Sequence, residues 1–313
     1  GENITIPDTI RDTILLRRGE LSYEAMKLLE IAAVAGLQFD LELVIRLAGD
    51  DRGLDELVNR SLIIEAKSGQ AAFSHALTRE AIYEEILWTR RRTLHRQLAE
   101  YLEADNAPAE LVAEHWLAGR ETDKARQALL VSARTSCDLY AYRDAATAAQ
   151  RALELWPEGE DEAMRLDVLD QLGNCAQLCG MLVEAARAWR EVAEGRRQTE
   201  DKQPLAEVQR RLATVYELQG AWGRALPARQ AAAAAFADSN LPGEAASERL
   251  AIAGHLHGLG NFNAALQLIA VAAEEAQQSG RQDLTARAWG LKGQILAKLG
   301  QFEAGREAVE AGL

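Results

Sequence analysis

The segment Leu172-Gly-Asn-Cys-Ala-Gln-Leu-Cys-Gly-Met-Leu-Val-Glu-Ala185 carries a pattern that recurs through much of this 313-residue chain. Its second glycine, Gly180, belongs to a series spaced 40 residues apart, in which a large apolar residue follows after two positions and a small residue after five. The copies are Gly180, Gly220, Gly260 and Gly300, with Leu182, Trp222, Phe262 and Phe302, and with Ala185, Ala225, Ala265 and Gly305. A further copy has Tyr140 in place of the glycine, followed by Tyr142 and Ala145. Five matches in one register indicate an internal repeat.

Each repeat is predicted to form two antiparallel helices. Apolar residues recur at helical spacing before the glycine and resume after it, as in Leu166, Leu169 and Leu172 and then Ala188, Trp189 and Val192. The glycine can adopt the left-handed conformation that ends a helix, and the small residue lets the second helix pack closely. Because such a pair cannot bury its apolar face alone, successive pairs should stack into an α-α superhelical solenoid.

This pattern resembles the tetratricopeptide repeats. Leu172, Gly173, Gly180, Leu182 and Ala185 fill the family's frame in one copy, and Pro157 stands at the closing proline of an earlier one. The repeat of 40 residues exceeds the ~34 of the family, so we expect helices about one turn longer. The predicted solenoid spans residues 125–313, about 4.5 repeats, and we expect it to end within a repeat.

Composition supports a soluble, mainly helical protein of about two domains. The apolar share is 48% and the net charge is −13, which argues against nucleic acid or another polyanion as a partner. No apolar run is long enough to cross a membrane, and the N-terminus has no secretory pattern. Together with three cysteines, an odd number, these features predict a cytoplasmic protein without a disulfide framework.

Catalytic and metal sites are not expected. No nucleophile has a base at a recognisable spacing, and His255 and His257, two residues apart on a helix, face different ways. Cys175 and Cys179 lie one helical turn apart, but no second pair or neighbouring histidine completes four ligands. Packing in the core is the favoured role of these cysteines.

Residues 1–75 do not follow the repeat and are predicted to form a winged-helix domain. Helices are expected after Pro7-Asp8, after a cap at Ser22, and over 40–47 and 54–62. Strands at 62–66 and 70–74 flank the turn Lys67-Ser68-Gly69. A helical connector, residues 76–124, would join this domain to the repeats.

The helix before the predicted wing is too acidic for a DNA reader. Asp50, Asp51, Asp55 and Glu56 stand against Arg52 and Arg60. Phosphates would repel this surface, so we expect the wing to pack against another domain of the protein.

Ala72–Tyr83 and Arg90–Glu103 resemble the region that joins the winged helix to helical repeats in bacterial signal-transduction ATPases with numerous domains, the STAND class. This class includes LuxR-type regulators similar to the maltose-regulon activator and cyclase-linked ATPases. Other segments resemble the same family, and the order of all these segments carries the resemblance; they are Ile6–Arg18, Ala32–Phe39, Glu114–Gly119 and Leu139–Tyr142. The resemblance implies that a nucleotide-binding module and an effector domain accompany this region. No phosphate-binding G-x-x-x-x-G-K-[ST] sequence occurs in the chain, so ADP or ATP is expected only in the full-length protein, of which this chain would be the regulatory part.

The resemblance also makes His75 a candidate contact to the β-phosphate of ADP, with Arg79 one helical turn later. The alternative is that both residues cap a helix or form salt bridges at its start.

The repeats supply the second candidate site. In the family's frame, four positions of each first helix line the concave face, which predicts a polar groove for a peptide, a protein segment or a polar small-molecule inducer. A merely solvated face is the alternative. Three functions stay open: a sensor that relays ligand binding to the ATPase module, a protein-interaction scaffold without one, and a DNA-binding regulator. The predicted groove residues are Asp167, Asp170, Asn174, Gln177, Glu207, Arg210, Thr214, Glu217, His257, Arg287 and Gln294.

Overall fold

The computed structural model describes residues 20–65, 69–197 and 202–312. The helix expected after Pro7-Asp8 lies outside these residues, as do Lys67 and Ser68 of the predicted turn. Contacts divide the chain into two compact units, which are described separately: unit 1 reaches Thr135 and includes Glu154–Trp156, and unit 2 holds 136–153 and 157–313. In the described part, no helix has both the length and the apolar character needed to cross a bilayer.

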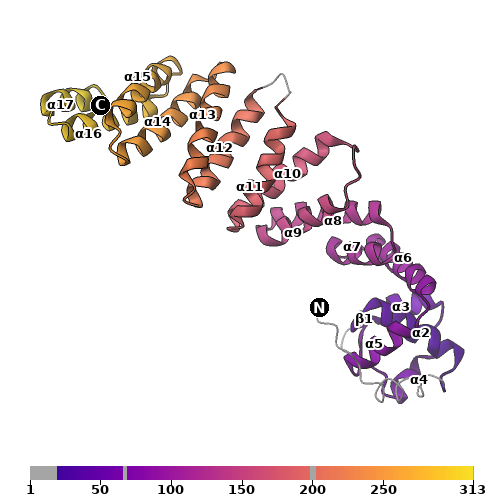
Figure 1. Ribbon diagram of the computed structural model, residues 1–313. Helices are drawn as coiled ribbons and strands as arrows, with labels where there is room; N and C mark the ends of the chain where they lie inside the picture. Colours follow the sequence, from indigo (N-terminus) through magenta and orange to yellow (C-terminus); the bar gives the residue numbers. More distant parts are fainter. Residues whose placement is uncertain (1–19, 66–68, 198–201, 313) are drawn as a thin grey trace. The chain divides into compact units, whose positions relative to one another are not determined.

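Unit 1 combines helices with a small antiparallel sheet (Figure 1). Helix α2 begins after Ser22, whose hydroxyl accepts a hydrogen bond from the Ala25 amide, as predicted, and α3 begins after Asp40 in the same way. The strand order β1-β3-β2 brings Phe39 against Phe73, with ring centroids 5.9 Å apart. The elements are α2 (Tyr23–Ala35), β1 (Gln38–Asp40), α3 (Leu41–Ala48), α4 (Leu54–Asn59), β2 (Ile63–Glu65), β3 (Gln70–Phe73), α5 (Ala76–Glu85), α6 (Trp88–Ala104) and α7 (Ala109–Ala118).

The repeats form helical hairpins in which each helix packs on the next along the chain. First helices are α10 (Glu162–Leu178), α12 (Gln203–Leu218), α14 (Pro242–Gly258) and α16 (Gln282–Lys298). Second helices are α11 (Leu182–Gly195), α13 (Trp222–Asp238), α15 (Phe262–Gln278) and α17 (Phe302–Ala311), and α8 (Thr122–Asp138) and α9 (Tyr142–Glu154) precede them. This is a tetratricopeptide-like solenoid, as predicted.

The predicted glycine turns are present. Gly180, Gly220, Gly260 and Gly300 have φ between +69° and +81°, and Tyr140, in the glycine's place, has φ +60°. After each of these residues an amide bonds back across the turn, for example Met181 N to the carbonyl of Ala176 at 2.7 Å. The small residues predicted at close helix contacts are buried, among them Ala185, Ala225 and Ala265.

Candidate binding surface

The predicted groove residues differ in how much they are tied to their neighbours. On α10 and α16, the exposed residues are Asp167, Asn174, Arg287 and Gln294. On α12, the four predicted residues are all partly buried, and two of them belong to a cluster of ion pairs. His257 is partly buried as well, and its Nε2 has no hydrogen-bond partner among the described residues.

Arg210 links two successive first helices. Its Nε donates to Oε1 of Glu248 on α14 at 2.8 Å, and another nitrogen of the same guanidinium donates to Glu244. Glu207, one turn earlier on α12, lies 3.7 Å away. The guanidinium also lies 4.3 Å from the centroid of the Phe236 ring. These contacts hold a predicted groove residue in one position, and they use donors that a ligand would otherwise meet.

Glu248 is a buried carboxylate at the centre of this arrangement. Its side chain is 3% exposed, and Arg229 of α13 donates to its Oε2 at 2.6 Å. Arg229 also binds Glu217 of α12, with Nη2 to Oε2 at 2.8 Å. Because a buried charge is costly unless it is paired, the two arginines offset the cost of burying the Glu248 carboxylate inside the hairpin stack. We call Arg210, Glu217, Arg229, Glu244 and Glu248 the ion cluster.

The ion cluster also changes the pKa of its two arginines. Hydrogen bonding to Glu217 raises the pKa of Arg229, and this outweighs the effect of burial. The pKa of Arg210 is likewise raised, since Glu244, Glu248 and Glu207 together exceed the lowering effect of its burial. Both guanidinium groups are therefore fixed charges.

Sequence reasoning found Arg210 and Glu217 but missed Arg229, Glu244 and Glu248. The signal was present in the repeat itself. At the position of Glu248 the other copies have Val168, Val208 and Ala288, and at that of Arg229 they have Trp189 and Ile269. An acidic and a basic residue at two repeat positions that are apolar in those other copies indicate a buried ion pair.

A second bridge joins α10 to α12. Asp170, a predicted groove residue, accepts from Nη1 of Arg211 at 3.0 Å and from the indole nitrogen of Trp189 at 3.1 Å. With Arg210 and Glu244, this bridge shows that successive first helices are joined through polar side chains. Asp167 makes a looser contact, 3.5 Å from Arg196.

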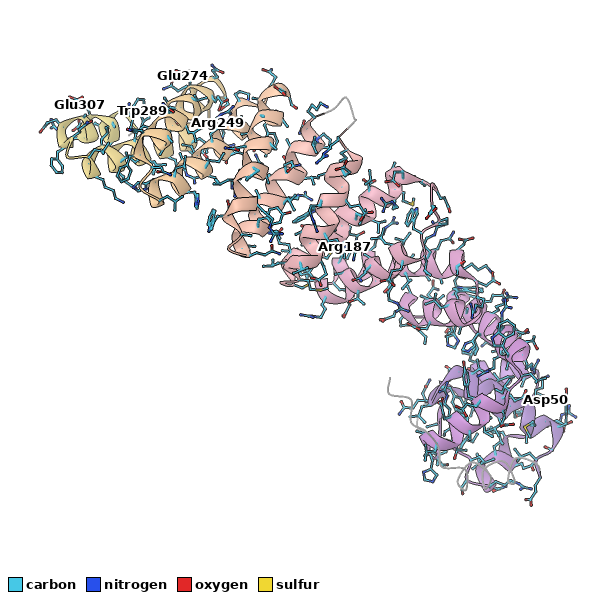
Figure 2. All side chains as sticks on the ribbon, in the orientation of Figure 1. Asp50, Arg187, Arg249, Glu274, Trp289 and Glu307 are labelled. Atoms are coloured by element: carbon cyan, nitrogen blue, oxygen red, sulfur yellow. The ribbon has the colours of Figure 1, made fainter. Side chains whose placement is uncertain are left out.

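Three clefts are lined by described residues of unit 2, and the eleven predicted groove residues line none of them. One lies between the turns at Asn240 and Ser279, with a volume of about 530 Å³. The other two lie beside α11 and α13 and share two arginines. The many side chains along these helices are drawn in Figure 2.

In unit 1, His75 and Arg79 have different surroundings. His75 is exposed at the start of α5, and its side chain makes no capping hydrogen bond. Arg79 is engaged: Nε donates to the carbonyl of Ala33 at 2.9 Å, Nη1 bonds Glu80 at 3.0 Å, and the guanidinium lies over Tyr83. Arg79 therefore stabilises the contact of α5 with α2.

The cysteines of unit 2 lie close together. The sulfurs of Cys137 and Cys175 are 3.5 Å apart, and Cys175 is buried. Burial raises the pKa of the Cys175 thiol to about 12. Cys175 thus occupies the core, where the sequence pattern predicted it.

No family model matches the chain, and no curated protein matches it. Among solved structures, it is similar to a STAND ATPase with a tetratricopeptide-repeat sensor from Pyrococcus horikoshii, with a TM-score of 0.46, 14% identity, and coverage of 100% of this chain and 53% of that one. It is also similar to aspartyl phosphate phosphatase F from Bacillus subtilis (0.48, 14%, covering 100% and 75%) and to YrrB, a TPR protein with an unusual peptide-binding site (0.42, 18%, covering 59% and 83%). At such scores, the similarities support no conclusion about partners or activity.

Proposed function

We propose that unit 2 is a protein-interaction scaffold whose first helices bind a polar segment of a partner protein. The observation behind this proposal is the set of bridges between successive first helices: Asp170 to Arg211, and Arg210 to Glu244 and Glu248. They fix a polar surface in place before a ligand arrives, which reduces the entropy lost on binding. Exposed residues on either side, Asn174 and Gln294, supply hydrogen-bonding groups.

A displayed peptide library selected on the protein tests this proposal. Substitution of Asn174→Ala together with Gln294→Ala should weaken the selected peptides by about 30-fold, since each removes a net hydrogen bond of about 1 kcal/mol. Gln230→Ala with Gln267→Ala, two exposed glutamines on second helices, is the matched control. If both pairs weaken binding equally, or neither does, the first helices are not the binding surface.

For unit 1, the proposed role is to relay this binding to a nucleotide-binding module of a signalling ATPase. The order α2-β1-α3-α4-β2-β3, with β1 paired to β3, supports the part of this proposal in which unit 1 is a winged helix. His75 is exposed directly after β3 and would face the nucleotide. A ligand shifts such a relay only if it binds one conformational state more tightly than the other.

The first check of this role is whether the encoded protein also carries a phosphate-binding loop with its lysine. In such a protein His75→Ala should shorten ADP retention, measured by release of labelled nucleotide. Tyr23→Ala, at a side chain that is 79% exposed on α2, serves as the control. Unchanged retention in His75→Ala would remove the nucleotide contact from the proposal.

A further inference from the structure

The two clefts beside α11 and α13 lie away from the predicted groove. The first, about 420 Å³, lies between α11 and α13, and α12 contributes Gln209, Leu212 and Tyr216 to its lining. At 100° per residue, the mean direction of these three lies roughly 130° around α12 from that of Arg210, Thr214 and Glu217. A ligand in this cleft would therefore contact a different face of α12 from one on the first-helix surface.

Both clefts contain Arg190 of α11 and Arg224 of α13. The second, about 560 Å³, continues from them towards the turn at Gly180, with Glu184 and Gln219 in its wall. The two hollows thus form one surface around a pair of arginines. We call it the arginine cleft.

The charges of this pair are not neutralised by the described part of the chain. Within residues 20–65, 69–197 and 202–312, no carboxylate lies within salt-bridge distance of Arg190 or Arg224. Arg190 donates from Nε to the Ala186 carbonyl at 3.2 Å, and the Arg224 guanidinium lies 4.9 Å from the Tyr216 ring centroid. The cleft's own Glu194 is paired with Arg197 at 2.9 Å. By contrast, Arg210, Arg211 and Arg229 all bind carboxylates.

Pro227 adds a hydrogen-bond acceptor to the same cleft. It lies inside α13 and has no amide hydrogen, so the carbonyl of Gly223 lacks the donor that position i+4 normally supplies. Gly223 and Pro227 both line the cleft, and Leu212 and Ala228 supply apolar surface beside them. Guanidinium donors, a main-chain acceptor and an apolar wall together match a peptide better than a simple anion.

We propose that the arginine cleft binds a short acidic segment of a partner protein, with a carboxylate held by Arg190 and Arg224 and an adjacent apolar side chain against Leu212 and Pro227. Charge complementarity supports this occupant, because both arginines are positive and unpaired on a protein of net charge −13. The proposal does not depend on the first-helix surface, since the two lie on different sides of α12.

The test uses the fluorescein-labelled peptide acetyl-Glu-Leu-Glu-Leu-Glu-amide and the same peptide with glutamine for glutamate, measured by fluorescence anisotropy on the whole chain. We expect the acidic peptide to bind and the glutamine peptide not to bind. Arg190→Gln with Arg224→Gln should weaken the acidic peptide by about tenfold or more, because hydrogen bonds between charged groups are lost. Binding should also weaken as ionic strength rises.

Arg143→Gln with Arg187→Gln is the matched control, because both residues are exposed and neither lines the cleft; Arg187 is labelled on α11 in Figure 2. This pair makes the same change in net charge and should leave affinity within about twofold. Circular dichroism melting of each variant verifies folding. Absence of binding to the wild-type chain, or equal loss in the two double variants, would overturn the proposal. So would tighter binding of a single-stranded oligonucleotide through Arg190 and Arg224.

Discussion

Gly173 lies where α10 meets the largest side chain of the repeat core. A Cβ atom at this position would be 2.5 Å from the indole nitrogen of Trp189, and that nitrogen is held by its hydrogen bond to Asp170. Gly173→Ala should therefore lower the free energy of unfolding by about 1–3 kcal/mol, the usual cost of overpacking. Urea denaturation measures this. Gly254→Ala, in a helix interior with open space around the new methyl group, should raise stability by about 0.5–1 kcal/mol.

The histidine pair of unit 1 makes stability depend on pH. Nδ1 of His95 lies 3.0 Å from Nδ1 of His115, and Tyr83 bonds the other nitrogen of His95 at 3.1 Å. One proton fits between the two Nδ1 atoms, so the two rings cannot both be protonated while this contact is kept. Burial lowers the pKa of each to about 4, and the neighbouring His115, Arg79 and Arg91 contribute for His95.

Because the unfolded chain binds these protons at a higher pH than the folded one, the pair's contribution is complete above about pH 6.5 and is lost as the pH falls towards 4. The loss is on the order of 3 kcal/mol per histidine. Urea denaturation at several pH values in this range should give a smaller slope for His115→Gln than for the wild type. Identical slopes would mean that the pair does not titrate on unfolding.

The elements show what the sequence could and could not predict. The turns at Gly180 and its equivalents were predicted, because glycine marks them in the sequence. The structure also shows positive φ at Arg120, Asn240 and Gly280, in the turns before α8, α14 and α16. Sequence reasoning did not locate these turns, because only one of the three residues is a glycine. The ion cluster was missed for a similar reason, since helical periodicity treats Glu248 as one more exposed charge.

The contribution of the buried pair of Arg229 and Glu248 to the contact between α13 and α14 can be tested by substitution. Arg229→Ile leaves Glu248 with one guanidinium instead of two and Glu217 with none from α13, so it should cost about 3 kcal/mol. Adding Glu248→Ala reproduces the Ile269 and Ala288 of the next repeat and should recover more than half of that loss. Thermal and urea unfolding of the single and double variants measure the coupling. Additive losses would show that the pair is not an independent unit of the core.

In the whole molecule, the residues of the turns and of the core recur every 40 positions, whereas the charged residues of the ion cluster and of the arginine cleft do not. Arg210 and Arg211 on α12 are paired with carboxylates, whereas Arg190 and Arg224 in the arginine cleft have no ion-pair partner among the described residues. Sequence reasoning assigned polar residues to helix faces but could not distinguish arginines that pair with carboxylates from arginines that do not. Pairing between helices depends on side chains 12 to 41 positions apart in the bridges described above.

A stack in which each helix packs on its neighbours should lose structure locally when its last repeat is disturbed. A Cβ at Gly293 would lie 2.6 Å from Cγ2 of Val309 and 2.9 Å from the carbonyl oxygen of Gly305, so Gly293→Ala disturbs the contact of α16 with α17. Hydrogen exchange measured by mass spectrometry should be about tenfold or more faster in these two helices, consistent with an overpacking cost of about 1–3 kcal/mol. Exchange in α10 to α13 should not change. Gly290→Ala, with open space at the same helix, is the control. Equal acceleration throughout unit 2 would instead show that its repeats unfold as one cooperative body.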